Sequence, residues 1–133
     1  MLFSVMDAIH QRRSIRAYRP DQLTDGQLQA ILEAGLAAPS ARNTQPWHFS
    51  VVQNAGLLKE FSLDYNRLQK SDPGRDILFF EAPTVVFIST PVDAPTRFSQ
   101  IDCGIAAQNM ALAAHSIGLG SVILGRPMEV FDT

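Results

Sequence analysis

The chain has 133 residues, of which 46% are apolar and 18% charged, a composition that is typical of a globular protein and excludes a disordered chain. Its net charge of -2 gives no general attraction to nucleic acid, and its apolar runs are far shorter than the roughly 20 residues of a membrane helix. The start, MLFSVMDAIHQRR, has no signal-peptide cleavage site and the lone Cys103 fits a reducing compartment, so we expect a cytoplasmic protein with one domain over residues 1–133.

A short helix is expected first, followed by an extended stretch that is rich in arginine. Ser4 with Asp7 matches a capping box, and the helix that follows should end near Arg12 or Arg13. Pro20 disfavours a helical residue before it, so residues 14–20 should be extended. Four of the eleven basic residues fall within eight positions: Arg12, Arg13, Arg16 and Arg19.

The rest of the chain is expected to alternate helices and strands, without repeats. Thr24 and Gln27 match a second capping box, and the helix after them should end before Pro39. The further expected elements are a strand over 48–53, a helix over 57–68, a largely buried strand over 83–90, a long helix from about 101 to the glycines at 118 and 120, and a strand over 121–124.

Three segments carry residues suited to binding. The first, RRSIR at positions 12–16, offers guanidinium groups and a hydroxyl, which donate directed hydrogen bonds to the oxygens of a phosphate ester. Taken alone, this segment is more simply interpreted as a solvated basic patch. A ligand becomes the better interpretation only if the other two segments point to the same chemistry.

The second segment, PSARNTQPW at positions 39–47, is a loop between a helix and a strand. Ser40, Asn43 and Gln45 offer both donors and acceptors, as a neutral planar ligand edge requires, and two prolines limit the freedom that binding would remove. The same polar groups can also merely cap the ends of the helix and the strand. Trp47 is expected in the core and not as a stacking platform.

The third segment, GLGS at positions 118–121, lies where the long helix gives way to an extended stretch. Glycines there permit positive φ and close approach of the backbone to a flat ligand. A glycine that simply ends the helix is the ordinary explanation.

The three segments in this order, RRSIR, PSARNTQPWHF and AAHSIGLGS, resemble the nitroreductase family from about residue 6 to residue 125. The strongest single feature is the pattern PSxxNxQPW. The resemblance implies an α+β fold, with a mainly antiparallel sheet flanked by helices, and a homodimer with two FMN sites at its interface.

The resemblance also implies which residues bind the cofactor. One set binds the FMN phosphate, the ribityl chain and the pyrimidine edge: Arg12, Arg13, Ser14 and Arg16. A second set comes from the partner subunit: Pro39, Ser40, Asn43 and Gln45, although Gln45 can instead use its side chain inside the turn. The backbone near Leu124 and Gly125 lies by the isoalloxazine, where an amide faces the flavin N5.

The implied activity is transfer of hydride from NADH or NADPH through FMN to a nitroaromatic, a quinone or a related small electron-poor acceptor, by a ping-pong mechanism. Arg16 is expected to stabilise negative charge on the reduced ring, and no side chain acts as a nucleophile. The alternatives are family relatives that dehalogenate, dehydrogenate or fragment flavin, and a non-catalytic protein that binds flavin, phosphate or nucleic acid. We expect no nucleic-acid or membrane partner.

Two further features bear on these expectations. The three histidines show no ligand spacing, so we expect no metal site, and Cys103 is expected to pack in a helix rather than to react. Family members usually continue through another helix and a strand whose basic residues reach the FMN phosphate. Here the last stretch, RPMEVFDT, resembles the opening of that helix, so the chain is either a naturally short form or a truncated record.

Overall fold

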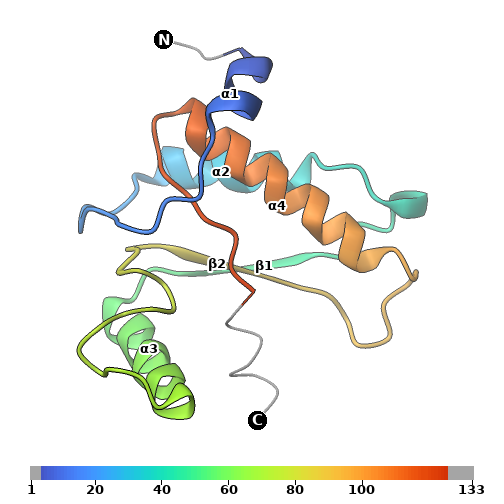
Figure 1. The fold of residues 1–133 in the computed structure, drawn as a ribbon. Coiled ribbons are helices and arrows are strands. Elements are labelled where there is room, and N and C mark those ends of the chain that lie inside the picture. Colours follow the sequence, from blue (N-terminus) through green and yellow to red (C-terminus); the bar gives the residue numbers. More distant parts are fainter. Residues whose placement is uncertain (1–3, 126–133) are drawn as a thin grey trace.

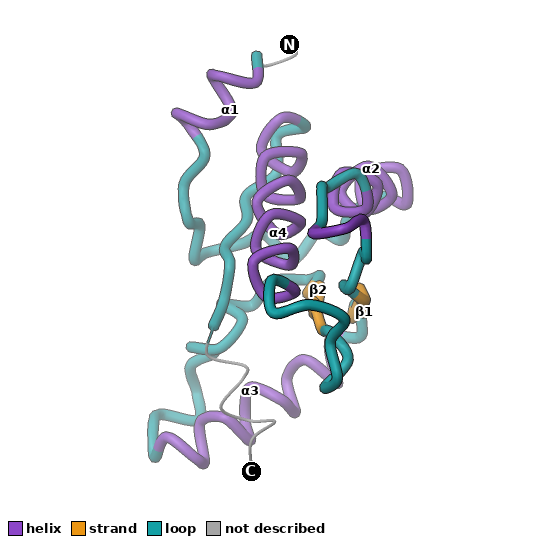
Figure 2. The backbone as a smooth tube through the Cα atoms, turned by 90° about the vertical axis from the view of Figure 1, so that its right-hand side faces the viewer, coloured by secondary structure: helices purple, strands orange, loops and turns teal. Residues whose placement is uncertain are grey.

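The computed structural model describes residues 4–125. Its helices and strands run in the order α1 (Val5–Gln11), α2 (Asp25–Leu36), a 3-10 turn η1 (Ala41–Asn43), β1 (His48–Val52), α3 (Ala55–Gln69), β2 (Val85–Ser89) and α4 (Ser99–Ser116). Figures 1 and 2 show α2 and α4 on one side of the two strands and α3 on the other. This is the expected α+β arrangement, with helices flanking an antiparallel sheet.

The helix starts are set by local capping. Both predicted capping boxes are present, since Ser4 Oγ accepts from Asp7 N at 3.1 Å and Thr24 Oγ1 accepts from Gln27 N at 3.2 Å. Asn54 caps α3 in the same manner, with its side-chain oxygen accepting from the third residue of the helix. As a result α3 begins two residues before its predicted start.

The two strands form the centre of the layers. They are antiparallel, with His48 opposite Ser89 and Val52 opposite Val85. Successive side chains of a strand point to opposite faces. Accordingly, one face packs against α3 in a cluster around Leu78 and Phe79, and the other packs against α2 and α4 around Ile31, Met110 and Ala114.

The structure corrects three strand predictions. Both strands are shorter than predicted, and β2 is half-buried rather than largely buried, because it has one hydrogen-bonded neighbour strand in the described part of the chain. The predicted strand over 121–124 is wrong, since only Ser121 pairs, in a single parallel bridge with Ser14. The expected further helix at 126–133 lies outside the described residues.

Candidate functional site

The first and third segments lie side by side. Ile15 N donates to the carbonyl oxygen of Ser121 at 3.0 Å, next to the bridge between Ser14 and Ser121. A Cβ on Gly120 would lie 3.1 Å from both Cγ atoms of Ile15 and 3.2 Å from its Cβ, so glycine is what allows this close approach. The fold therefore brings RRSIR against the stretch that follows α4.

Gly118 has a different function from Gly120. Its φ of 82° places it in the left-handed region, and Leu119 N donates back to the carbonyl oxygen of Ala114 at 2.9 Å. Gly118 N donates to the carbonyl oxygen of His115 at 3.0 Å, which completes a Schellman motif. The interpretation of this glycine as the stop of the long helix is confirmed.

The arginine cluster, defined as Arg12, Arg13, Arg16 and Arg19, has no acidic partner among residues 4–125. The one ion pair in this range joins Arg67 to Asp64, on α3. Arg13 Nη1 donates to the carbonyl oxygens of His10 at 2.6 Å and Arg12 at 2.9 Å, so its guanidinium group is held over the end of α1. The cluster thus keeps its positive charge available to an external anion.

Arg12 supplies a more specific observation. Its Nε is buried and has no hydrogen-bond partner in the described part of the chain. A buried charged donor without an acceptor is costly, and most such groups in proteins are paired. An anionic group placed beside Arg12 would satisfy this donor.

The Tyr18 side chain bonds back to the arginine-rich stretch that it follows. Its hydroxyl donates to the carbonyl oxygen of Ile15 at 2.6 Å. Burial raises the pKa of the Tyr18 phenol, and the positive charge of Arg16 offsets part of this rise. The phenol therefore stays protonated, and remains a donor, to a higher pH than an exposed tyrosine.

The second segment forms a tight turn over residues 40–45. Three of its residues have positive φ without being glycine: Arg42 at 56°, Asn43 at 54° and Gln45 at 46°. Ser40 Oγ accepts from Gln45 N at 2.9 Å, and Gln45 Nε2 donates to Asn43 Oδ1 at 3.0 Å. The Gln45 side chain is therefore used inside the turn, and the side chains of Ser40 and Asn43 accept hydrogen bonds there.

Trp47 anchors the end of this segment in the core. It is 8% exposed, packs with Ala38 and Ala106, and stacks on Phe49 with ring centroids 6.2 Å apart. The prediction of a core role is confirmed. Cys103 packs against the same cluster, and its pKa is raised by burial and by the neighbouring Asp102 carboxylate, which fits a packing role.

Within one chain, the turn and the arginine cluster lie at opposite ends of α4. Ala41 N donates to the carboxylate of Asp102, in the first turn of α4, whereas Ser121 lies beyond the last turn (Figure 1). The 18 residues of α4 correspond to about 27 Å at 1.5 Å per residue. A single chain therefore does not bring both sets of predicted residues to one ligand.

Asp102 is a residue that sequence analysis missed. It is 3% exposed, and its Oδ1 accepts from Ala41 N at 3.1 Å. A signal was present in the sequence, because Asp102 is the one acidic or basic residue between Arg97 and Arg126 if histidine is left aside. An isolated charge in an apolar helix calls for a structural partner.

The remaining predicted positions follow α4. Leu124 packs against the cluster under α3, and Gly125 is exposed at the end of the described range. This stretch leaves the end of α4 and crosses to the α3 side of the strands (Figure 1). The backbone of this stretch therefore passes the RRSIR segment.

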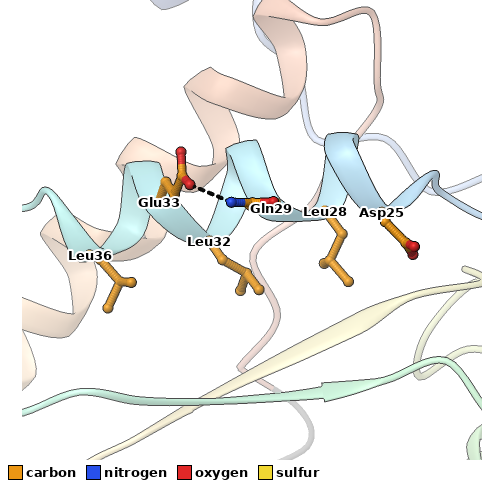
Figure 3. Close-up of a pocket in the computed structure, with 6 residues that line it drawn as sticks. All are labelled: Asp25, Leu28, Gln29, Leu32, Glu33 and Leu36. Carbon is orange, nitrogen blue, oxygen red and sulfur yellow. Dashed lines mark hydrogen bonds between the residues drawn. The ribbon is translucent and has the colours of Figure 1, made fainter.

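A surface groove along α2 contains none of the predicted site residues. Leu28, Leu32 and Leu36 project from one side of the helix, and Gln29 donates to Glu33 at 2.8 Å beside them (Figure 3). Residues four apart share a helix face, so this is a leucine stripe and not a site with convergent polar groups.

Residues 4–125 contain no group of three metal-ligating side chains, and none of their helices has the length and apolar character needed to cross a membrane.

Comparison with known proteins identifies the family. The model of the Nitroreductase family matches residues 9–130. A provisionally named NADH dehydrogenase/NAD(P)H nitroreductase from Methanothermobacter thermautotrophicus is 36% identical over 128 residues, which cover 94% of this chain and 63% of that protein. This chain thus spans less than two thirds of that relative's length.

Solved structures show the same likeness. A nitroreductase with bound FMN from Bacteroides fragilis has a TM-score of 0.78 and 35% identity, covering 90% of this chain and 68% of that chain. A nitroreductase with bound FMN from Desulfitobacterium hafniense has a TM-score of 0.79 and 31% identity, covering 99% of this chain and 75% of that chain.

Proposed function

Because this chain belongs to the nitroreductase family, we propose that it is a subunit of an FMN-dependent oxidoreductase. It takes hydride from NADH or NADPH and reduces a nitroaromatic, a quinone or another small electron-poor acceptor. The relative from Methanothermobacter thermautotrophicus carries a NAD(P)H nitroreductase name, and two similar structures hold FMN. The lone Cys103 fits a cytoplasmic location, and residues 1–133 form one FMN-binding domain in this proposal.

The observation that carries the proposal is an arginine cluster that has no acidic partner among residues 4–125, together with the buried Arg12 Nε. A phosphate monoester supplies the charge and the acceptor oxygens that this donor set lacks. Ser14, held by its bridge to Ser121, adds a hydroxyl at the same place. The residues present thus fit the phosphate end of FMN.

The placement of the turn supports a site shared by two copies. Pro39, Ser40 and Asn43 lie about one α4 length from the arginine cluster of their own chain, so in this proposal they serve the cofactor of the partner subunit. Exposed apolar side chains on α1 and at the start of α4 favour burial against a second copy of the chain. They are Val5, Met6, Ile9, Phe98 and Ile101.

When bound, FMN supplies the hydride chemistry, so the side chains of this chain bind, orient and stabilise charge. The guanidinium group of Arg16 stabilises negative charge on the pyrimidine edge of the reduced ring. Arg12, Arg13 and Ser14 hold the phosphate and the ribityl chain. The backbone at Leu124 and Gly125 supplies an amide to the reacting edge of the ring, and no residue forms a covalent bond with substrate.

The test is reconstitution of the full chain with FMN, followed by anaerobic addition of NADH or NADPH. Bound FMN should give a yellow protein whose flavin absorbance is bleached by one or both nicotinamides. Arg16→Ala should weaken FMN binding or slow its reduction, whereas Arg67→Ala removes a surface arginine elsewhere and should change neither.

Three results would decide among the alternatives. FMN binding without reduction by any two-electron donor would replace the enzyme with a flavin-binding protein. No FMN binding would reject the proposal for this chain. Monomers that keep FMN, measured by native mass spectrometry, would reject the shared site.

A further inference from the structure

The turn at 40–45 is tied to α4 through a buried carboxylate. Asp102 Oδ1 accepts from Ala41 N at 3.1 Å, a contact between residues 61 positions apart in the sequence. The residue is 3% exposed, and its Oδ2 is buried without a hydrogen-bond partner in the described part of the chain. This carboxylate thus makes one hydrogen bond, and one of its two oxygens has no partner among the described residues.

A buried carboxylate at position 102 should stabilise the fold less than an apolar side chain would. Burial removes the water that solvates the group, and a single hydrogen bond does not replace it. The neighbouring α4 positions Ala106 and Met110 are buried and apolar, so an apolar side chain would suit the helix better. The contribution of Asp102 must therefore come from the segment that it holds in place, the 40–45 turn.

The turn that it holds needs external support. Left-handed backbone at three non-glycine residues, Arg42, Asn43 and Gln45, is sparsely populated in free chains and persists only where the surroundings enforce it. Internal hydrogen bonds close the turn, and the Ala41–Asp102 bond fixes its first residue to a rigid helix. Ser40 and Asn43 lie one and two residues from Ala41, so this bond restrains the position of both.

We propose that Asp102 is a positioning residue of the cofactor site: it holds the 40–45 turn at the start of α4, so that Ser40 and Asn43 reach the FMN bound by the partner subunit. This inference rests on the proposed function. Asp102 does not touch the cofactor and acts through Ala41. Its loss should loosen the turn locally and leave the arginine cluster as it is.

The test compares Asp102→Ala with Asp102→Asn, which keeps a side-chain acceptor for Ala41 N. The matched control is Asp76→Ala. Asp76 Oδ1 accepts from Ser62 Oγ at 2.6 Å and from Phe79 N at 2.9 Å, so it also organises a loop, but one under α3. Asp102→Leu, which has a similarly branched side chain, replaces the alanine variant if that variant does not fold.

The first measurement uses the FMN-free protein. Trypsin cuts after Arg42, inside the turn, and mass spectrometry of the products gives the rate at this bond. Asp102→Ala should be cut several-fold faster than the wild type, whereas Asp102→Asn and Asp76→Ala should be cut at nearly the wild-type rate. Unfolding curves of all variants separate this local opening from a loss of global stability.

The second measurement is the FMN dissociation constant. Asp102→Ala should raise it at least tenfold, about 1.4 kcal/mol, and Asp102→Asn should restore most of the affinity. Unchanged cleavage and unchanged affinity in Asp102→Ala would overturn the inference and leave the proposed function standing. If the wild type binds no FMN, the proposed function fails, while the cleavage rates still show whether Asp102 holds the turn.

Discussion

Replacement of Gly120 by alanine tests whether the contact between the first and third segments positions the arginine cluster. The added Cβ would lie 3.1 Å from Ile15 Cγ1 and Cγ2 and 3.2 Å from Ile15 Cβ. Rotation about χ1 of Ile15 moves the two Cγ atoms but not its Cβ. The backbone must therefore shift, and we expect the shift to stretch the 3.0 Å bond from Ile15 N to the Ser121 carbonyl oxygen.

The size of the effect follows from these distances. Carbon atoms pack best at about 3.5–4.0 Å, so the two segments must separate by at least roughly 0.3 Å. Weakening one backbone hydrogen bond loses up to about 1 kcal/mol, and overpacking of this kind adds a similar amount. We expect Gly120→Ala to lower the free energy of unfolding by about 1–2 kcal/mol and to raise the FMN dissociation constant several-fold.

The measurements are urea unfolding followed by circular dichroism, at fixed protein concentration, and FMN titration. Ile15→Ala removes the opposing Cγ atoms, so the double variant should recover part of both losses. Gly26→Ala is the matched control, because nothing lies within 4 Å of a Cβ there and helix propensity alone should make it neutral or slightly stabilising. A Gly120→Ala protein as stable as Gly26→Ala, with wild-type FMN affinity, would refute the reasoning.

Other predictions concern the core and two titrating groups. Gly35→Ala should lower the free energy of unfolding by about 1–3 kcal/mol, because its Cβ would overlap the end of Met110, and Met110→Ala should reduce that loss in the double variant. Tyr18 should ionise above its ordinary pKa of 10.0 in an ultraviolet pH titration, with Tyr18→Phe identifying its signal. Since burial raises the folded pKa, the stability that Tyr18 contributes is complete below its ordinary pKa of 10.0 and is lost as the pH rises through the folded pKa. Cys103, whose pKa is raised, should be alkylated more slowly in the folded protein than in urea.

The sequence predicted the features whose physics is local. Capping boxes at Ser4 and Thr24 join residues three positions apart, so the residue types alone specify them. Gly118 as a helix stop is equally local. Trp47 was expected in the core because a tryptophan is more often a core aromatic than a stacking platform, and it is buried. The order of helices and strands followed from these signals with small errors at the ends.

Features that depend on distant contacts were not predictable in the same way. The apolar run over 122–124 led us to predict a strand, but whether it pairs as one depends on what lies beside it, and Leu124 is used for packing under α3. The bridge between Ser14 and Ser121 and the bond between Ala41 and Asp102 join residues far apart in the chain. The roles of the cofactor residues rest on family resemblance and remain predictions.

Because α4 separates the two sets of cofactor residues within one chain, mutations that damage each set can be placed in different subunits. If each cofactor meets the arginine cluster of one subunit and the 40–45 turn of the other, a subunit with Arg16→Ala and a subunit with Asn43→Ala damage different halves. Each homodimer is then impaired at both of its sites. Coexpression, however, yields mixed dimers in which one site carries both lesions and the other carries none, so two inactive forms should complement one another and regain FMN binding.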